Sequence, residues 1–258
     1  MIQLFCSWRP IVEGTIVAMN LKEDFITRSK LRDIGRWHVT QFVKEVAASL
    51  PARTLLLDAG AGECAYKSLF LRQRYVAIDA ALGDAAWNYH NLNVIGAIDN
   101  LPFPNNSFGA ILCTETLEHL KQPFESVTEF YRVLQPGGQL FLTTPFAHAE
   151  HQIPHDYFRY TSFALTSICA RSGFAEIRVE PFGGMFTRMA YELPSILSVF
   201  PAAGWKTRQW KLRGLLCLPI KAILLVAIRA TQWILLGLDR YDNTRNYPFG
   251  WRVTARKC

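Results

Sequence analysis

Hydrophobic and polar residues along this chain form blocks that predict helices and strands in turn. Apolar residues recur at helical spacing through residues 23–50, and Pro51 follows them. Short apolar runs, each predicting a buried strand, occupy residues 54–57, 75–78, 92–98, 108–113, 139–144, 175–180 and 251–255. Helices are expected between them at 63–72, 123–134 and 162–172. This alternation predicts an α/β fold: a Rossmann-like, seven-stranded, mostly parallel sheet with helices on both faces.

A further apolar segment lies where such a sheet needs only a short connection. Residues 185–249 separate the sixth and seventh expected strands, and within them Gly214–Leu238 is strongly apolar. Pro219, Lys221 and Arg229 interrupt this run. Two cations make a membrane-spanning helix costly. We therefore expect a helical insertion that either lies in a membrane interface, or packs on the sheet or against a second copy of the chain.

The chain has 258 residues, which suits one α/β domain with an insertion. We expect four parts: an N-terminal tail and helix at 1–50, a core at 51–184, the apolar and basic helical insertion at 185–249, and the final strand of the core at 250–258. The six cysteines form no C-x-x-C pair, and charged residues interrupt the N-terminus in a way unlike a signal peptide. These features favour a reduced, cytoplasmic setting.

The formal net charge of +7 divides unevenly along the chain. Residues 58–118 hold seven acidic and three basic side chains, whereas residues 185–258 hold twelve basic and three acidic ones. The basic residues are mixed with long apolar runs rather than arranged in a stripe with stacking aromatics. The C-terminal part therefore favours an anionic membrane surface over nucleic acid as a partner.

Candidate binding chemistry gathers where the first strands end. Gly60–Ala65 fits the loose pattern G-x-G-x-x-G/A, and Asp79 follows Gly60 by nineteen residues. Asp58 and Asp99 end two further expected strands. Ligands of parallel α/β sheets bind outside the carboxyl ends of the strands. The glycine turn and these acids suit any nucleoside cofactor, dinucleotides included.

Four motifs in a fixed order make the sequence more specific: LLLDAGAGECAY (55–66), YVAIDAA (75–81), AIDNLPFPNNSFGAILCTETLEHL (97–120) and LQPGGQLFLTTP (134–145). Together they resemble the class I S-adenosylmethionine-dependent methyltransferases of the D-x-G-x-G type. The stretch PHDYFRYT (154–161) is similar to methyltransferases of bacterial glycan and polysaccharide biosynthesis.

The resemblance implies S-adenosylmethionine as cofactor. It assigns the cofactor site to Asp58, Gly60 and Gly62 at the methionine end, Asp79 at the ribose hydroxyls, Asp99 and Leu101 at adenine, and Thr114 at the sheet edge. The cofactor is a sulfonium cation without a pyrophosphate, so a carboxylate-rich edge suits it better than it suits a dinucleotide.

Methyl transfer to a hydroxyl needs an aligned acceptor and a base that takes its proton. The candidate catalytic residues are Glu115 and His119 after the fourth expected strand and His155 after the fifth. The alternative for His119 and His155 is a structural role, in which each histidine only orients its loop through a hydrogen bond. Glu115-x-x-Glu118-His119 with His155 also resembles the divalent-metal set of ubiquinone-pathway O-methyltransferases and small-RNA 2′-O-methyltransferases. Metal-free relatives carry the same pattern, so the sequence leaves a metal open.

We expect an O-methyltransferase whose acceptor is a glycan, a lipid-linked intermediate or another small molecule, located in the cytoplasm and attached peripherally to the inner face of the membrane. Two alternatives stay open. One is a methyltransferase for a lipophilic quinone-type aromatic, and the other is a catalytically silent interaction protein that binds the cofactor. The oligomeric state is not indicated by the sequence.

Overall fold

The computed structural model describes residues 33–84, 86–199 and 211–258. The expected N-terminal tail and the first part of the helix expected at 23–50 lie outside this range. The rest of that helix is α2 (Ile34–Ser49), which begins at an Asp33 N-cap whose carboxylate accepts a hydrogen bond from the Arg36 N–H at 2.9 Å.

One seven-stranded sheet forms the centre of the molecule, as the hydrophobic pattern predicted. Its strands are β1 (Leu55–Ala59), β2 (Arg74–Asp79), β3 (Val94–Ile95), β4 (Phe108–Thr114), β5 (Leu134–Pro145), β6 (Ala175–Phe182) and β7 (Gly250–Arg256). They lie in the order β3-β2-β1-β4-β5-β7-β6. Only β7 runs antiparallel to its neighbours β5 and β6. The carboxyl ends of β1, β2 and β4 therefore share one edge.

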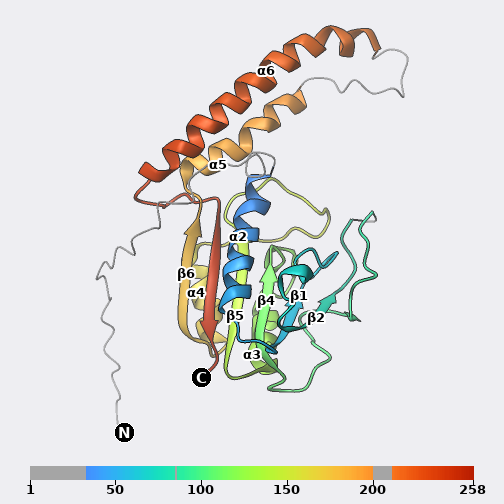
Figure 1. The fold of residues 1–258 in the computed structure, drawn as a ribbon, viewed down its shortest axis with the longest axis vertical. Helices are drawn as coiled ribbons and strands as arrows, with labels where there is room; N and C mark the ends of the chain where they lie inside the picture. Colours follow the sequence, from blue (N-terminus) through green and yellow to red (C-terminus); the bar gives the residue numbers. More distant parts are fainter. Residues whose placement is uncertain (1–32, 85, 200–210) are drawn as a thin grey trace.

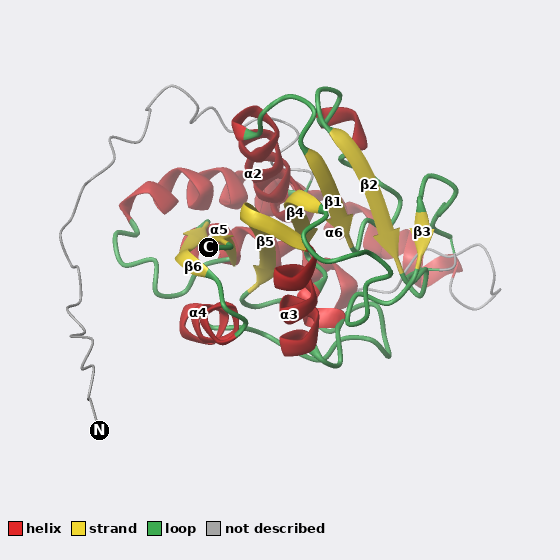
Figure 2. Ribbon diagram, turned by 90° about the horizontal axis from the view of Figure 1, so that it is seen from below, coloured by secondary structure: helices red, strands yellow, loops and turns green. Residues whose placement is uncertain are grey.

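Helices cover both faces of this sheet (Figure 2). Successive strand residues point to opposite faces, and the core divides accordingly. Leu56 of β1 is buried with residues of α2, whereas Leu57 is buried with residues of α3 (Pro123–Val133) and α4 (Ser162–Arg171). Because both faces of the sheet are buried, the sequences of its central strands are nearly continuous apolar runs.

The connection between β1 and β2 differs from expectation. The helix predicted at 63–72 is wrong, because only a short 3-10 helix, Lys67–Leu69, forms there. Gly62 and Cys64 have φ angles of 51° and 58°, and these left-handed conformations interrupt a right-handed helix. The third strand is also shorter than expected and stops four residues before Asp99.

The insertion forms a helical cap beside the carboxyl edge of the sheet. It contains α5 (Met185–Glu192), a 3-10 helix (Leu193–Val199) and α6 (Lys211–Leu238). Figure 1 shows α6 as one continuous helix that runs over α5 and extends beyond the sheet. The apolar run is thus a single helix before the last strand and not a hairpin.

A buried carboxylate fixes the end of this cap. Asp239 accepts hydrogen bonds from the N–H groups of Gly184, at 3.1 Å, and Thr187, at 2.8 Å, and pairs with Arg245 at 2.7 Å. The C-terminal end of α6 is thereby tied to the first turn of α5, which holds α6 in place relative to the sheet.

Candidate active site

A cavity of about 420 Å³ opens at the shared carboxyl edge of β1, β2 and β4. The loops after these strands, the loop after β5, the first turns of α2 and one residue of α5 form its wall. Among the residues that line it are Gly60, Gly62, Asp79, Trp87, Ile98, Thr114, Glu115, His119, His148, His151, His155 and Tyr191. Segments far apart in sequence therefore meet at the edge where the sequence predicted a site.

The glycine turn after β1 lets the backbone approach this cavity closely. Gly60 has a φ angle of 80°, and a Cβ at this position would collide with the side chain of Thr116. The Gly62 N–H donates a hydrogen bond to Asp79 Oδ2 at 2.9 Å, and the Ala81 N–H donates to Oδ1 at 2.7 Å. Asp79 thus holds the two loops together, and each of its carboxylate oxygens keeps a lone pair for a ligand hydroxyl. This cradle fits the ribose of a nucleoside cofactor.

Four of the seven residues implied for the cofactor, Gly60, Gly62, Asp79 and Thr114, line the cavity, and the other three do not. Asp58 is buried behind the turn, where it accepts a hydrogen bond from the Tyr75 hydroxyl, and burial raises the pKa of Asp58 to about 7. Asp99 is exposed, and its neighbour Ile98 lines the cavity instead. Leu101 is buried in the core. The roles assigned to these three residues by resemblance stay predictions.

Glu115 lines the cavity and follows β4 directly. Its backbone has a φ angle of 47°, a left-handed conformation that non-glycine residues adopt rarely. Hydrogen bonds from its N–H to the carbonyl oxygen, at 3.0 Å, and the side-chain oxygen of Thr143 keep it there. Its Oε1 atom is buried and has no hydrogen-bond partner within residues 33–84, 86–199 and 211–258, and burial raises the pKa of this carboxyl to about 7.

The loop after β5 is pinned over the site by an ion pair. Arg159 donates to Asp156 at 2.6 and 2.8 Å, and its guanidinium also donates to the His148 carbonyl. This pairing holds the pKa of Asp156 well below its usual range. The N–H groups of Tyr157 and Phe158 donate to the Glu118 carbonyl, which joins this loop to the segment after β4. Arg159 is therefore occupied within the loop.

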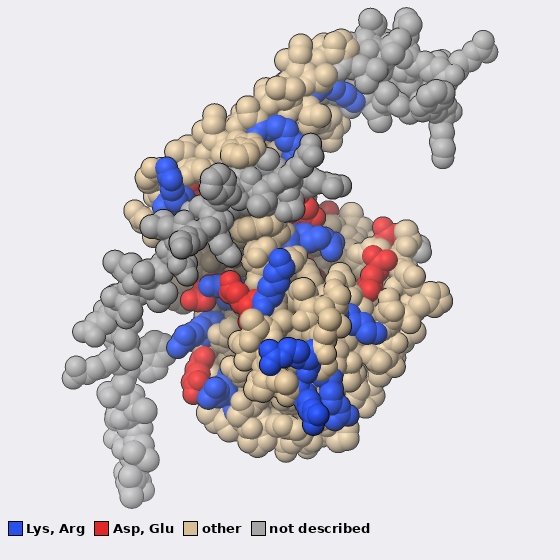
Figure 3. Space-filling view, in the orientation of Figure 1, with Lys and Arg blue, Asp and Glu red and all other residues tan. Residues whose placement is uncertain are grey.

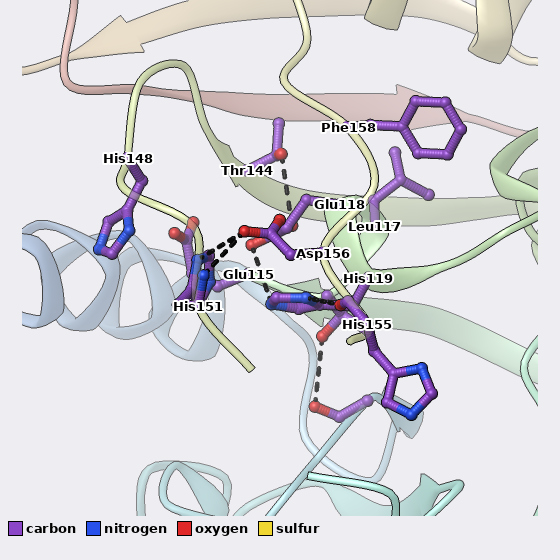
Figure 4. A network of polar contacts seen from close by, with 12 residues as sticks. Glu115, Leu117, Glu118, His119, Thr144, His148, His151, His155, Asp156 and Phe158 are labelled. Atoms are coloured by element: carbon purple, nitrogen blue, oxygen red, sulfur yellow. Dashed lines mark hydrogen bonds and ion pairs between the residues drawn. The ribbon is translucent and has the colours of Figure 1, made fainter. Parts of the chain in front are cut away.

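The two histidine segments are brought together by these contacts (Figure 4). The ring of His119 lies 4.6 Å from the ring of His151, and His151 lies 4.4 Å from His148. His155 points away from this group and pairs with the Tyr157 hydroxyl at 3.2 Å. All three candidate catalytic residues, Glu115, His119 and His155, line the cavity.

Sequence reasoning missed two aromatic wall residues. The Trp87 ring lies beside Gly62 and Gly83, and the Tyr191 hydroxyl contacts His148 from α5. Trp87 belongs to an irregular stretch after β2, where no periodicity marks a buried face. Its only signal is a large aromatic side chain, and Tyr89 in the same loop carries that signal too. Tyr191 lies in the insertion, whose return to the site could not be inferred from spacing.

Comparisons with known proteins agree with this geometry. Residues 57–142 match a family described as a methyltransferase domain. The ubiquinone/menaquinone biosynthesis C-methyltransferase of Pseudoalteromonas translucida is 36% identical over 83 residues, which are 30% of this chain and 33% of that protein. This chain spans about a third of the length of the curated relatives it matches.

Solved structures resemble the whole fold. A methyltransferase from Archaeoglobus fulgidus, described as dependent on S-adenosylmethionine, superposes with a TM-score of 0.54 at 13% identity and covers 89% of this chain and 97% of its own. Phosphoethanolamine N-methyltransferase 2 of Haemonchus contortus, in complex with S-adenosyl-L-methionine, superposes with a TM-score of 0.50 at 14% identity. The superposition covers 86% of this chain and 52% of that protein's chain. The predicted class I methyltransferase fold is therefore confirmed.

Proposed function

We propose that this chain, which carries a methyltransferase domain with the class I fold, transfers a methyl group from S-adenosylmethionine to a hydroxyl acceptor. The observation that carries the proposal is the meeting of the Asp79 cradle with Glu115 in one cavity. The cofactor, when bound, supplies an electrophilic methyl group on a cationic sulfur. The glycine turn and Asp79 orient it, and Glu115 accepts the proton of the acceptor.

Retention of this machinery supports an enzyme over a catalytically silent interaction protein. Asp79 and Glu115 both line the cavity; the Asp79 carboxylate accepts hydrogen bonds from two backbone N–H groups, and the Glu115 N–H donates to Thr143. A protein that used the fold only for docking would have no need of a buried carboxylate oxygen that has no partner in the described part of the chain and lies in the same cavity as the cofactor cradle.

For the acceptor we propose a glycan hydroxyl on a lipid-linked intermediate. The wall opposite the cradle carries hydrogen-bonding side chains, among them His148, Gln152 and Tyr191, which suit the hydroxyls of a sugar. The cavity wall also includes α5, which packs under the apolar helix α6. The names of the curated relatives favour a lipophilic quinone-type acceptor as the second candidate.

One labelling experiment separates the two acceptors. The full chain is incubated with methyl-labelled S-adenosylmethionine and a membrane lipid extract, and the labelled product is isolated and hydrolysed. We expect the label in an O-methyl sugar. Label on the ring of a quinone precursor would support the second candidate instead, and no transfer to either fraction would contradict both.

We further propose that the enzyme works in the cytoplasm at the inner face of a membrane, which it contacts through the outer face of α6. A 23-residue stretch, Pro219–Tyr241, is long and apolar enough to cross a membrane, yet only 17% of its most apolar window is buried in the protein. One such helix is weak evidence by itself. The distribution of side chains around the helix gives the stronger argument.

The residues of α6 that face the protein recur at every fourth position. Ile228, Gln232 and Leu236 are at most 7% exposed, and Gln232 donates a hydrogen bond to the Ala190 carbonyl of α5. The opposite face, here called the outer face, is centred on Ile223 and consists of the exposed residues Ile223, Val226, Ala227, Ala230, Trp233 and Ile234. Of these, Ile223 and Val226 are each 70% exposed. An apolar side chain scattered on a surface is ordinary, but a continuous face of this kind marks an interaction site.

The cations that interrupt the apolar run in sequence lie off this outer face. At 100° per residue, Lys221 falls on the side of Ile228, and Arg229 falls on the flank, where it donates to Gln232 at 2.9 Å. Figure 3 shows α6 as largely uncharged, with basic side chains at intervals. The outer face is therefore uninterrupted, which suits a helix lying in the membrane plane.

Charge favours lipid over a second copy of the chain. Residues 211–238 contain four basic and no acidic residues. A two-fold dimer through the outer face would place two copies of this basic helix side by side, and their like charges would repel because α6 itself contributes no acidic residue. Anionic headgroups would neutralise them, and Trp233 and Tyr241 are residue types that favour the interface between headgroups and acyl chains.

Substituting Val226 by aspartate is expected to reduce co-sedimentation with vesicles that contain anionic lipid at least about tenfold, because a charge on the outer face opposes insertion. Affinity for S-adenosylmethionine, measured by calorimetry, should stay unchanged. The matched control is Leu71→Asp, which places a charge on an apolar side chain that is 87% exposed and far from α6 in the sequence. Equal binding by the two variants, or a dimer that Val226→Asp abolishes, would contradict the membrane proposal.

A further inference from the structure

We propose that Glu118, His119 and His151 form a binding site for a divalent transition-metal ion in the wall of the cavity. One ligand atom from each of the three residues lies within 4.8 Å of the others. His119 and His151 line the cavity, and Glu118 is fully buried behind it. The proposal does not depend on the identity of the methyl acceptor.

The hydrogen bonds of His119 leave one ring nitrogen for a ligand. Its Nδ1 contacts the carbonyl oxygen of His155, and a carbonyl can only accept, so Nδ1 carries the proton. In the neutral ring, Nε2 then has the lone pair. Nε2 is buried and has no hydrogen-bond partner among the described residues.

His151 is oriented in the same way. Its Nδ1 lies 3.1 Å from the Ala149 carbonyl oxygen and 3.2 Å from Asp156 Oδ2, both of which are acceptors. Asp156 is itself held by Arg159. A carboxylate or carbonyl that fixes the far nitrogen of a histidine is the usual outer shell of a metal-bound imidazole. In both histidines, Nδ1 therefore donates to an oxygen acceptor, and Nε2 keeps a lone pair for a metal ion.

Glu118 presents an acceptor to the same space. Its Oε2 atom accepts a hydrogen bond from Thr144 at 3.4 Å, while Oε1 is buried without a hydrogen-bond partner among the described residues. Glu118 Oε1 lies 3.7 Å from His119 Nε2, too far for a direct hydrogen bond. A cation bound between these two buried acceptors would satisfy both of them at once. Figure 4 shows Glu118 beside the rings of His119 and His151.

The donor set indicates the class of metal. Two imidazole nitrogens and one carboxylate oxygen suit iron, cobalt or zinc dications better than magnesium or calcium, which prefer oxygen ligands. The set also differs from the one suggested by sequence resemblance, because His151 takes the place expected for His155. The imidazole of His155 points away from the group. A dication here would attract an acceptor oxygen to the wall that holds Glu115.

Cobalt titration of the metal-depleted full chain tests this site. We expect one Co²⁺ ion per chain, detected by equilibrium dialysis and by visible absorption of protein-bound cobalt. His119→Ala and His151→Ala should each abolish this site, and Asp156→Asn should weaken binding about 10- to 100-fold by releasing the His151 ring. Thermal melting and affinity for S-adenosylmethionine establish that each variant is folded.

His155→Ala is the matched control, since it removes a neighbouring imidazole but keeps the backbone carbonyl that orients His119. It should bind Co²⁺ like the wild type. If His155→Ala lost Co²⁺ binding and His151→Ala kept it, the ligand would be His155, as the sequence resemblance suggested. That result would overturn the proposal. Absence of stoichiometric binding to the folded wild-type chain would also overturn it.

Discussion

Replacing Asp79 by alanine is expected to weaken the binding of S-adenosylmethionine by a factor of about 30 to 150. Hydrogen bonds to a charged acceptor contribute about 2–3 kcal/mol when the partner is left unpaired, and every 1.4 kcal/mol is tenfold in Kd. The same change frees the N–H groups of Gly62 and Ala81, so the glycine turn loses its support. Isothermal titration calorimetry of the full chain measures the effect directly.

The control for this variant is Asp84→Ala, which removes an acidic charge from the same loop. The Asp84 carboxylate is exposed and accepts a hydrogen bond from the N–H of Ala86 in its own turn. Its substitution should change Kd less than about threefold, because an exposed charge interacts weakly with a ligand at a distance. Equal losses in the two variants would mean that general charge, and not the Asp79 cradle, attracts the cofactor.

Glu115→Gln is expected to lower kcat by a factor of about 10² to 10⁴ while leaving the Kd of the cofactor almost unchanged. The amide keeps the shape of the side chain but cannot take the acceptor proton, and a positioned base contributes about this much to the rate. The measurement compares single-turnover methyl transfer with calorimetric binding in the same protein.

Glu125→Gln is the matched variant for Glu115→Gln, because Glu125 lies exposed in the first turn of α3, on the far side of the sheet from α2. It should transfer methyl groups at the wild-type rate. If Glu115→Gln were equally active, the base would have to be another group of the cavity wall, and the remaining candidates from the sequence are His119 and His155.

The sequence predicted the sheet well because its strands are buried on both faces. Leu56 and Leu57 pack into opposite cores, so the run that contains them has no polar interruption and is recognisable as a strand. The prediction of a helix between β1 and β2 was wrong for a local reason. Hydrophobic spacing does not reveal that Cys64 adopts a left-handed φ angle, which depends on the turn around the glycines.

The site was only partly predictable from sequence. Motif order placed Asp79 and Glu115 on the correct edge, because the carboxyl ends of parallel strands converge. It could not choose between His151 and His155, which are four residues apart in an irregular loop. That choice depends on the Arg159–Asp156 ion pair and on the hydrogen bonds to Glu118, which are tertiary contacts.

For the helical insertion, too, the sequence predicted the element but not its tertiary contacts. Composition predicted an apolar helix, and Lys221 and Arg229 argued against a spanning one. Only the position of α6 against α5 determines that these cations lie off the outer face, since the buried side is set by Ile228, Gln232 and Leu236. A linear sequence does not fix which side of a mostly apolar helix faces the protein.

Calorimetric titration of the full chain with S-adenosylmethionine, and separately with NAD, tests the central claim most directly. The two cofactors share a ribose that Asp79 can hold, but only NAD carries a pyrophosphate, which the carboxylates of this edge would repel. We expect saturable binding of one S-adenosylmethionine per chain and no measurable binding of NAD. Binding of NAD with no response to S-adenosylmethionine would contradict this claim.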